Sequence, residues 1–127
     1  DLHRRRHSFP TRRSSDLNEI IEVPFLSGCF MFLDATNLRK ENGFDDNFFM
    51  YLEDTDLSRR MFKYGNYFYP HALIQHGFGK ASFKSYKMTL IHIRSAIKYF
   101  NKWGWFIDKE RKIVNKNILR KYTNKEV

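Results

Sequence analysis

The sequence predicts an α/β domain in which strands of a mixed sheet are followed by long C-terminal helices. β-Branched and aromatic residues concentrate between Ile20 and Leu33, a composition typical of strands. Apolar residues recur at helical spacing from Glu53 to Tyr64 and again over residues 83–100. With 127 residues, 42% of them hydrophobic and 17% aromatic, the chain has enough apolar material for the core of one domain.

Charge is distributed unevenly along the chain. Residues 1–17 carry five arginines and no apolar periodicity, and they resemble translated sequencing-adapter sequence, so we expect them to be disordered and non-native. Residues 18–79 carry nine acidic and five basic groups, whereas residues 80–127 carry thirteen basic and three acidic groups. We therefore expect a domain of residues 18–82 that holds a polar site, followed by a basic helical region of residues 83–127 that meets anions.

The N-terminal part of this domain is expected to alternate strand, helix and turn. Ile20 to Leu33 reads as one or two strands, and Ser27-Gly28 marks a bulge or the close approach of a ligand. Asp34 is placed to cap a short helix that ends near Asn42-Gly43. Residues 45–47, Asp-Asp-Asn, are typical of a turn.

A cluster of three carboxylates opens the next predicted helix, which runs from Glu53 to Tyr64 and stops at Gly65. At 100° per residue, Leu57, Met61 and Tyr64 fall on one stripe, which we expect to be buried.

Two of these carboxylates have different expected roles. Asp56 falls on the polar side of the helix, where the simplest interpretation is a solvated i,i+4 ion pair with Arg60. Asp54 lies in the first turn of the helix, on the apolar face and nearly in line with Met61. A carboxylate in that position either caps the helix or faces an open functional cleft, and the residue pattern leaves both interpretations open.

The C-terminal part of the sequence predicts a strand, a corner at Pro70, a second strand and a glycine loop, followed by two helices. The first helix ends at Gly104 and the second, basic helix covers residues 107–121. The first of these helices carries an apolar seam, flanked on one side by Lys87, Arg94 and Lys98. The members of the seam are Phe83, Tyr86, Leu90, Ile93, Ile97 and Phe100. The seam either packs on its own domain or, with Trp103, Trp105 and Phe106, contacts an anionic bilayer from one side.

Several classes of site are excluded by residue type and spacing. A single cysteine, Cys29, excludes an internal disulfide framework and a cysteine-based zinc site. The longest apolar run, Val23 to Leu33, is shorter than the roughly 20 residues of a membrane-spanning helix. A phosphate-binding loop is excluded because Ile74 and Ala81 stand where it requires Gly and Ser or Thr. What remains is a carboxylate at a helix start and His76 in the glycine loop.

An ordered set of short motifs runs through residues 20–105. The set comprises Ser27-Gly28, Gly43-Phe44-Asp45, Phe48-Phe49, Glu53-Asp54, Asp56-Leu57, Arg59-Arg60, Gly65, Pro70, His76 and Ser82. In this order the motifs resemble the C-terminal half of the catalytic domain of GT-A-fold, family-two inverting glycosyltransferases, and are closest to the bacterial rhamnosyltransferase-like members. The resemblance implies that the α/β domain is the acceptor-side half of a GT-A fold.

The resemblance implies a role for each of several matched residues. Asp54 would be the general base that takes a proton from the acceptor hydroxyl, and Glu53 would orient the acceptor or cap the helix. His76 would be a ligand for Mg²⁺ or Mn²⁺ that bridges the donor diphosphate. The residues that would contact the donor are Ser27, Gly28, Lys80 and Ser82.

The resemblance also implies a reaction and a setting. A nucleotide-diphosphate sugar, with dTDP-rhamnose as the leading donor, would give its sugar to a glycan or lipid-linked acceptor during synthesis of a cell-wall or surface polysaccharide. We expect the protein to be cytoplasmic, with peripheral contact at the inner face of the plasma membrane. The nucleotide-binding half and the Asp-x-Asp metal motif of the family do not occur upstream of Ile20, so we expect these 127 residues alone to have little or no activity.

The alternative function is a basic module without catalysis that binds nucleic acid or an anionic membrane. Basic charge mixed with aromatic residues is the composition that such a module requires. The acidic middle section and the absence of a recognised nucleic-acid motif argue against nucleic acid as the partner.

Overall fold

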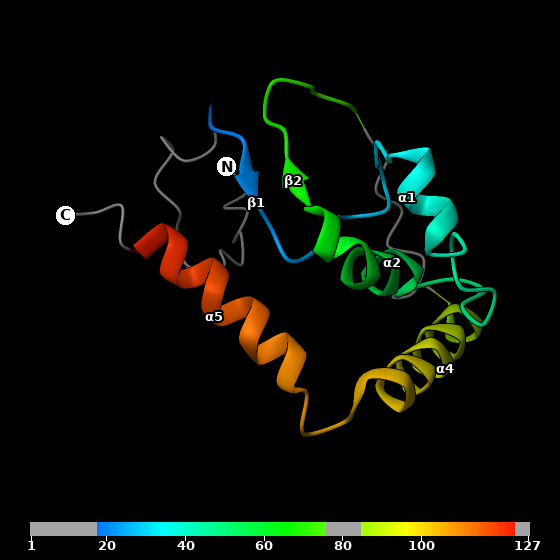
Figure 1. Cartoon of the computed structure of the whole chain (residues 1–127). Coiled ribbons are helices and arrows are strands. Elements are labelled where there is room, and N and C mark those ends of the chain that lie inside the picture. Colours follow the sequence, from blue (N-terminus) through cyan, green and yellow to red (C-terminus); the bar gives the residue numbers. More distant parts are fainter. Residues whose placement is uncertain (1–17, 76–84, 124–127) are drawn as a thin grey trace, which may run out of the picture.

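The computed structural model describes residues 18–75 and 85–123. Its elements in chain order are β1 (Ile21–Glu22), α1 (Ala35–Lys40), α2 (Glu53–Met61), the 3₁₀ helix η2 (Phe62–Tyr64), β2 (Tyr67–Phe68), α4 (Tyr86–Trp103) and α5 (Lys109–Thr123). Figure 1 shows α2 at the centre, α4 and α5 as two long arms joined by a loop, and the strand pair at the opposite end. The predicted mixed α/β class with C-terminal helices is confirmed at this level.

The sheet is smaller than the sequence predicts. β1 pairs antiparallel with β2, with Ile21 opposite Phe68, and each strand has two residues. The pairing continues in one further hydrogen bond, in which Val23 N–H donates to Asn66 O at 2.9 Å. Residues 23–33 and 72–75 are not strands, so the longer strands expected there are wrong. β-Propensity alone does not make a strand, because a strand also needs a neighbour to pair with.

The predicted start of α1 is confirmed. Asp34 is the N-cap, and its Oδ1 accepts a hydrogen bond from Asn37 N–H at 2.7 Å. Asn42 and Gly43 follow the helix with φ of 59° and 68°, the left-handed conformation that ends many helices. The predicted turn at residues 45–47 also forms, closed by the 2.9 Å bond from Phe48 N–H to Asp45 O.

The central helix α2 forms as predicted, and Gly65 with φ of 94° ends the 3₁₀ turn that extends it. Leu57 and Met61 are buried, but Tyr64 is 38% exposed, so its predicted place on the buried stripe is wrong. The chain tightens from α to 3₁₀ geometry after Met61, so the 100° spacing no longer holds at Tyr64.

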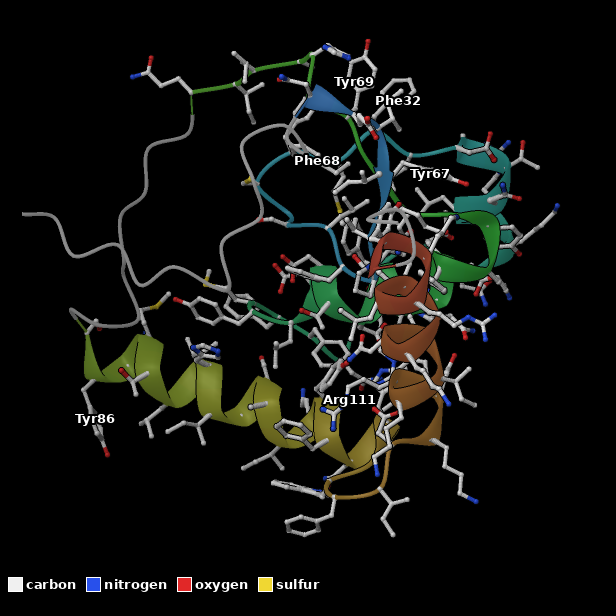
Figure 2. The ribbon with its side chains drawn as sticks, turned by 90° about the vertical axis from the view of Figure 1, so that its left-hand side faces the viewer. Phe32, Tyr67, Phe68, Tyr69, Tyr86 and Arg111 are labelled. Atoms are coloured by element: carbon white, nitrogen blue, oxygen red, sulfur yellow. The ribbon has the colours of Figure 1, made fainter. Side chains whose placement is uncertain are left out.

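The orientation of α4 contradicts the expectation that its seam packs on its own domain. The helix ends at Gly104, as predicted, and its buried residues are Ser95 and Tyr99. The seam lies on the opposite face, and Figure 2 shows its first described member, Tyr86, pointing away from the rest of the protein. Phe83, also assigned to the seam, lies outside the described residues.

The last helix, α5, closes the fold against β1. Asp108 starts it by accepting Arg111 N–H on Oδ1 at 2.9 Å. Near its end, the Tyr122 hydroxyl accepts Glu22 N–H at 2.7 Å, and Lys121 pairs with the Glu22 carboxylate at 2.7 Å. Within the part of the chain that the structure describes, no helix has the length and hydropathy needed to cross a bilayer.

Candidate functional site

The candidate site lies at the start of α2, where the backbone is strained. Tyr51 and Leu52 both have φ of 67°, a left-handed conformation that is uncommon for residues other than glycine. Leu52 is the N-cap, and its carbonyl accepts the first helical bond from Asp56 N–H at 2.9 Å. The Tyr51 ring stacks on His92 of α4 with centroids 4.6 Å apart, which holds this turn in place. Strain of this kind concentrates at functional sites.

Asp54 follows this turn in a partly exposed position. Its Oδ2 accepts Gly28 N–H at 2.8 Å, and its Oδ1 accepts Thr55 N–H at 2.7 Å and the Thr55 hydroxyl at 3.3 Å. Because Leu52 is the N-cap and makes no side-chain capping bond, Asp54 is not the capping residue. Its Oδ1 nevertheless satisfies one amide of the first turn, where a carboxylate is electrostatically favoured.

The structure brings the predicted Ser27-Gly28 pair against Asp54. A Cβ at position 28 would lie 3.0 Å from the Asp54 Cβ, closer than such atoms normally approach. Glycine therefore allows the backbone to come close enough for the Gly28 N–H to bond the carboxylate. The sequence predicts a bulge or the close approach of a ligand at Ser27-Gly28, whereas in the structure the group that comes close is the side chain of Asp54, 26 residues later in the chain. Both Ser27 and Gly28 are exposed.

Glu53 contributes an unpaired polar atom to the same end of α2. Its Oε2 is buried and has no hydrogen-bond partner in residues 18–75 and 85–123. Most buried polar atoms in proteins are hydrogen-bonded, so an unpaired carboxylate oxygen indicates a place where a bound donor fits.

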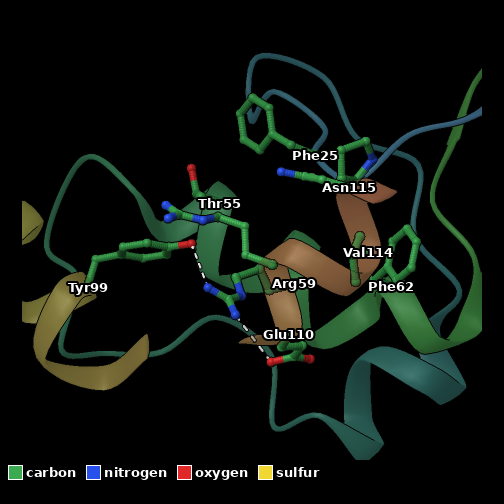
Figure 3. A pocket seen from close by; sticks show the side chains of 10 residues that line it. Phe25, Thr55, Arg59, Phe62, Tyr99, Glu110, Val114 and Asn115 are labelled. Atoms are coloured by element: carbon green, nitrogen blue, oxygen red, sulfur yellow. Dashed lines mark hydrogen bonds and ion pairs between the residues drawn. The ribbon is translucent and has the colours of Figure 1, made fainter. Parts of the chain in front are cut away.

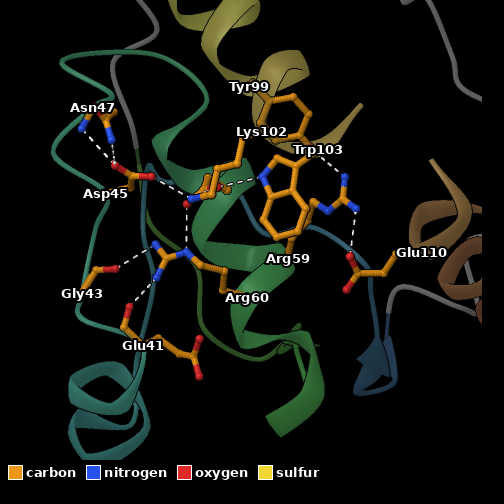
Figure 4. A network of polar contacts seen from close by, with 11 residues as sticks. Glu41, Gly43, Asp45, Asn47, Arg59, Arg60, Tyr99, Lys102, Trp103 and Glu110 are labelled. Carbon is orange, nitrogen blue, oxygen red and sulfur yellow. Dashed lines mark hydrogen bonds and ion pairs between the residues drawn. The ribbon is translucent and has the colours of Figure 1, made fainter. Parts of the chain in front are cut away.

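Asp56 is not the solvated ion pair that the sequence predicts. The bond to Arg60 forms, from Nε to Oδ2 at 2.8 Å, but the Asp56 side chain is 0% exposed. Its Oδ1 accepts Trp103 Nε1–H and Lys102 Nζ–H, each at 2.8 Å. Figure 4 labels both donors, Trp103 and Lys102, beside Arg60. Asp56 is buried because α4 covers the side of α2 that carries it. It is therefore a structural carboxylate that joins the two helices.

The cations around Asp56 extend the network to the loop after α1. Arg60 donates to the carbonyls of Glu41 and Gly43 at 2.6 and 2.8 Å, and Lys102 donates to Asp45 Oδ2 at 2.7 Å. The hydrogen bond from Lys102, helped by Asn47 N–H, lowers the pKa of Asp45 to about 2. Burial acts to lower the pKa of Lys102, but its bonds to Asp45 and Asp56 outweigh this and raise it.

A second polar cluster forms around Arg59, on the side of α2 that faces α5. Its guanidinium binds both oxygens of Asp108, at 2.6 and 3.0 Å, and lies 4.0 Å from the Trp103 ring centroid. It also donates to the Tyr99 hydroxyl at 3.3 Å and to Glu110 at 3.2 Å. The bond to Arg59 lowers the pKa of Asp108, and Asp108 raises the pKa of Arg59 against the opposing effect of burial.

A cavity of about 160 Å³ lies beside this second cluster (Figure 3). It is bounded by α2, α4, α5 and the segment before Ser27, and its lining residues are Pro24, Phe25, Thr55, Arg59, Phe62, Tyr99, Glu110, Arg111, Val114 and Asn115. Asp54 does not line this cavity. The neighbouring Thr55 does, so the cavity and the Asp54 site share one turn of α2.

Three of the predicted site residues, His76, Lys80 and Ser82, lie outside the described residues. Over residues 18–75 and 85–123, His, Cys, Asp and Glu side chains form no group of three or more that could hold a metal ion. The expected Mg²⁺ or Mn²⁺ depends on His76, which is outside this part of the chain, so the metal stays a prediction and the proposal below uses none.

Sequence reasoning missed four features of this region: the left-handed Tyr51-Leu52 turn, the burial of Asp56, and the roles of Trp103 and Asp108. One of the two interpretations of the seam places Trp103 at a membrane, but its indole is half-buried against Arg59. No family model, curated protein or solved structure matches this chain.

Proposed function

We propose that this chain is the acceptor-side half of a GT-A-fold glycosyltransferase and that Asp54 is its general base. The observation that supports this most is the meeting of two separate motif segments, in which the Gly28 amide binds Asp54 Oδ2 at 2.8 Å. A carboxylate held in this way at a helix start is fixed in position while it stays partly open to solvent.

The proposed reaction is a single displacement with inversion. The acceptor hydroxyl oxygen attacks the anomeric carbon of a nucleotide-diphosphate sugar and gives its proton to Asp54. The bond from the anomeric carbon to the diphosphate breaks, and its electron pair leaves with the diphosphate. Each carboxylate oxygen can accept two hydrogen bonds, and among residues 18–75 and 85–123 one donor, the Gly28 amide, occupies such a position on Oδ2. Oδ2 therefore retains an acceptor position for the incoming hydroxyl.

Two further observations support the same place. The buried, unpaired Oε2 of Glu53 offers an acceptor for a second hydroxyl of the sugar acceptor. The left-handed residues Tyr51 and Leu52 set the angle at which α2 begins, and so fix the direction of Asp54. Rhamnose remains the proposed sugar by resemblance alone, and a glycan or lipid-linked acceptor is proposed on the same ground.

The test uses the complete reading frame that contains these residues, since the resemblance implies a nucleotide-binding half that the 127 residues do not include. Transfer of labelled sugar and binding of the donor are measured for the unchanged protein, Asp54→Asn and Asp46→Asn. We expect Asp54→Asn to lower turnover by about 100-fold or more while donor binding is retained. Asp46 is exposed on a turn and serves as the matched control, with turnover unchanged.

Two results would contradict the proposal. The first is an Asp54→Asn variant that turns over at the rate of the unchanged protein. The second is a robust transferase activity of the 127-residue chain alone, which the proposal expects to have little or none.

A further inference from the structure

We propose that the outward face of α4 binds peripherally to the surface of an anionic lipid bilayer. This face is the outward seam, defined by Tyr86, Leu90, Ile93, Ile97 and Phe100. Binding of this face to a membrane goes beyond the proposed transfer reaction, and it requires none of the residues around Asp54.

The orientation of α4 is fixed by polar contacts on its opposite face. Ser95 Oγ donates to Met50 O at 2.6 Å, and Trp103 donates to the buried Asp56 at 2.8 Å. Tyr99 is buried and its hydroxyl accepts from Arg59. At 100° per residue, Ser95 lies about 180° from the centre of the outward seam. The polar face of this helix therefore faces inward, and its apolar face is left outside.

Four of the five members of the outward seam are exposed, and Phe100 is half-buried. The exposed fractions are 80% for Tyr86, 46% for Leu90, 51% for Ile93 and 44% for Ile97. A monomeric protein rarely leaves an apolar strip of this kind uncovered unless something binds there.

The seam continues beyond the end of α4. The Phe100 ring lies against Trp105, with centroids 5.2 Å apart, and Trp105 is 49% exposed. Phe106 and Ile107 follow with exposed fractions of 89% and 73%. The apolar surface thus runs from Tyr86 through the loop between α4 and α5, with aromatic side chains at both ends. Aromatic residues favour the boundary between hydrocarbon and water.

The charges beside the outward seam are positive. Helix α4 contains no acidic residue, and Lys87 and Arg94 are exposed along one flank of the seam. Between residues 85 and 123 there are ten Lys and Arg against two acidic residues, Asp108 and Glu110. Both acidic side chains bind Arg59 and so are directed toward α2. The partner of this surface must therefore combine an apolar phase with negative charge.

An anionic bilayer provides both of these properties, whereas the other candidate partners provide one. A second copy of the chain would cover the seam, but it would bring Lys87 and Arg94 against another cationic α4 in a chain of net charge +9. Nucleic acid supplies phosphates and base faces, but Leu90, Ile93 and Ile97 can neither pair with phosphates nor stack as aromatic rings do. Acyl chains accept Leu and Ile, and anionic headgroups attract the flanking cations.

The experiment measures co-sedimentation of the full chain with vesicles of phosphatidylcholine alone or of phosphatidylcholine mixed with phosphatidylglycerol. We expect binding to the anionic vesicles, weakening as salt is raised, and little binding to the neutral ones. The double substitution Ile93→Ser with Ile97→Ser should lower the partition coefficient by about tenfold. Trp105 fluorescence should shift to the blue when anionic vesicles are added, because its exposed indole enters the interface.

Matched variants distinguish binding through the outward seam from nonspecific binding through other exposed apolar or basic side chains. Leu73→Ser with Ile113→Ser removes two exposed aliphatic side chains elsewhere and should leave binding unchanged. Lys87→Gln with Arg94→Gln should weaken binding to anionic vesicles more than Lys112→Gln with Lys116→Gln, since all four residues are exposed but only the first two flank the seam. Circular dichroism checks that each variant folds, and none of these side chains is buried.

Five outcomes would overturn the proposal. The first two are equal binding to neutral and anionic vesicles and no binding to either. The third is unchanged binding by the seam variant, and the fourth is a dimer in lipid-free solution that the seam variant dissociates. The fifth is binding of duplex or single-stranded DNA that needs Lys87 and Arg94 but not Ile93 and Ile97. Because no sugar transfer is measured, failure here leaves the Asp54 proposal standing, and loss of the Asp54 proposal leaves this one standing.

Discussion

Asp54 and Asp56 are two residues apart on α2, yet they lie in opposite environments. Asp56 is 0% exposed and accepts hydrogen bonds from Arg60, Lys102 and Trp103. Asp54 is partly exposed and accepts from two backbone amides and one hydroxyl, with no cation bound to it in any contact that the structure describes. Two positions on an α-helix are separated by about 200°, which puts one carboxylate under α4 and leaves the other outside.

The difference separates two uses of the same functional group. Asp56 is surrounded by donors from α2 and α4, and through Arg60 and Lys102 it reaches the loop after α1. Such a carboxylate stabilises the fold and, because it is 0% exposed, a substrate cannot reach it. Asp54 is positioned mainly by backbone groups and keeps acceptor capacity on Oδ2. The comparison can therefore be tested by substituting each side and measuring whether stability or activity changes.

The largest effect on stability is expected from Asp56→Ala. Removing this carboxylate, whose side chain is 0% exposed, leaves Lys102, Arg60 and the Trp103 indole without their shared acceptor. Breaking a buried ion pair in this way costs about 3–5 kcal/mol, a large part of the stability of a small domain. Urea unfolding followed by circular dichroism measures the loss.

The matched control for this substitution is Asp46→Ala. Because Asp46 is exposed, this substitution should change the free energy of unfolding of the protein by less than about 0.5 kcal/mol. If Asp56→Ala behaves like Asp46→Ala, Asp56 is the solvated residue that the sequence predicts, and α4 does not cover it.

The next largest effect is expected from Arg59→Ala, which tests the other side of α2. Asp108 is 4% exposed and would lose both guanidinium bonds, although it keeps the Arg111 amide. We therefore expect a smaller loss than for Asp56→Ala, of about 2–3 kcal/mol, again measured by urea unfolding. Arg120→Ala, on the exposed face of α5, is the control, and an equal effect of the two substitutions would show that the Arg59 cluster does not stabilise the fold.

The parts of the fold that could be predicted from the sequence follow from local backbone rules. Asp34 caps α1 because its side chain reaches the amide of Asn37, which is only three residues ahead in the chain. Gly65 and Gly104 end their helices because glycine adopts positive φ at little cost. The resemblance places Ser27 and Gly28 against the donor and does not predict the bond from the Gly28 amide to Asp54, and the role of Asp54 stays a prediction.

The remaining features depend on contacts between distant segments, which residue periodicity does not describe. Asp56 is buried by Trp103, which lies 47 residues later in the chain. Periodicity correctly separates the apolar and polar faces of α4, but it cannot tell which face turns inward when Ser95 and Tyr99 make the inward contacts. The assumption that apolar faces pack inward gave the wrong orientation for α4 and the wrong environment for Asp56.

Lowering the pH is expected to have a smaller effect on stability, through the network that lies on the Asp56 side of α2. Asp45 belongs to the network around Asp56, and its bond to Lys102 lowers its pKa to about 2 in the folded protein. The pKa of an unfolded Asp is about 3.9, so Asp45 stabilises the folded state above about pH 4 and loses this contribution as pH falls toward 2. The difference in unfolding free energy between the unchanged protein and Asp45→Asn should therefore shrink over this range.

Urea unfolding at several pH values between about 2 and 6 measures this difference. Asp46→Asn is the matched control, because Asp46 is the exposed neighbour of Asp45, and its difference from the unchanged protein should stay constant. A constant difference for Asp45→Asn as well would show that Lys102 does not bind Asp45 in solution.

The smallest effect on stability is expected from Asp54→Asn. The amide has nearly the same shape as the carboxylate, and its one carbonyl oxygen can still accept either the Gly28 or the Thr55 amide. In the contacts that the structure describes, Asp54 binds no cation, so this substitution leaves none without its partner. The free energy of unfolding should therefore fall by less than about 1 kcal/mol. Urea unfolding of Asp54→Asn beside Asp56→Asn compares the two positions directly. If Asp54→Asn is the more destabilising of the pair, Asp54 is a structural residue, and the Gly28 contact serves the fold instead of a base. If it is the less destabilising and sugar transfer is still lost, the two carboxylates differ as their surroundings indicate, one holding the helices together and the other open to an acceptor.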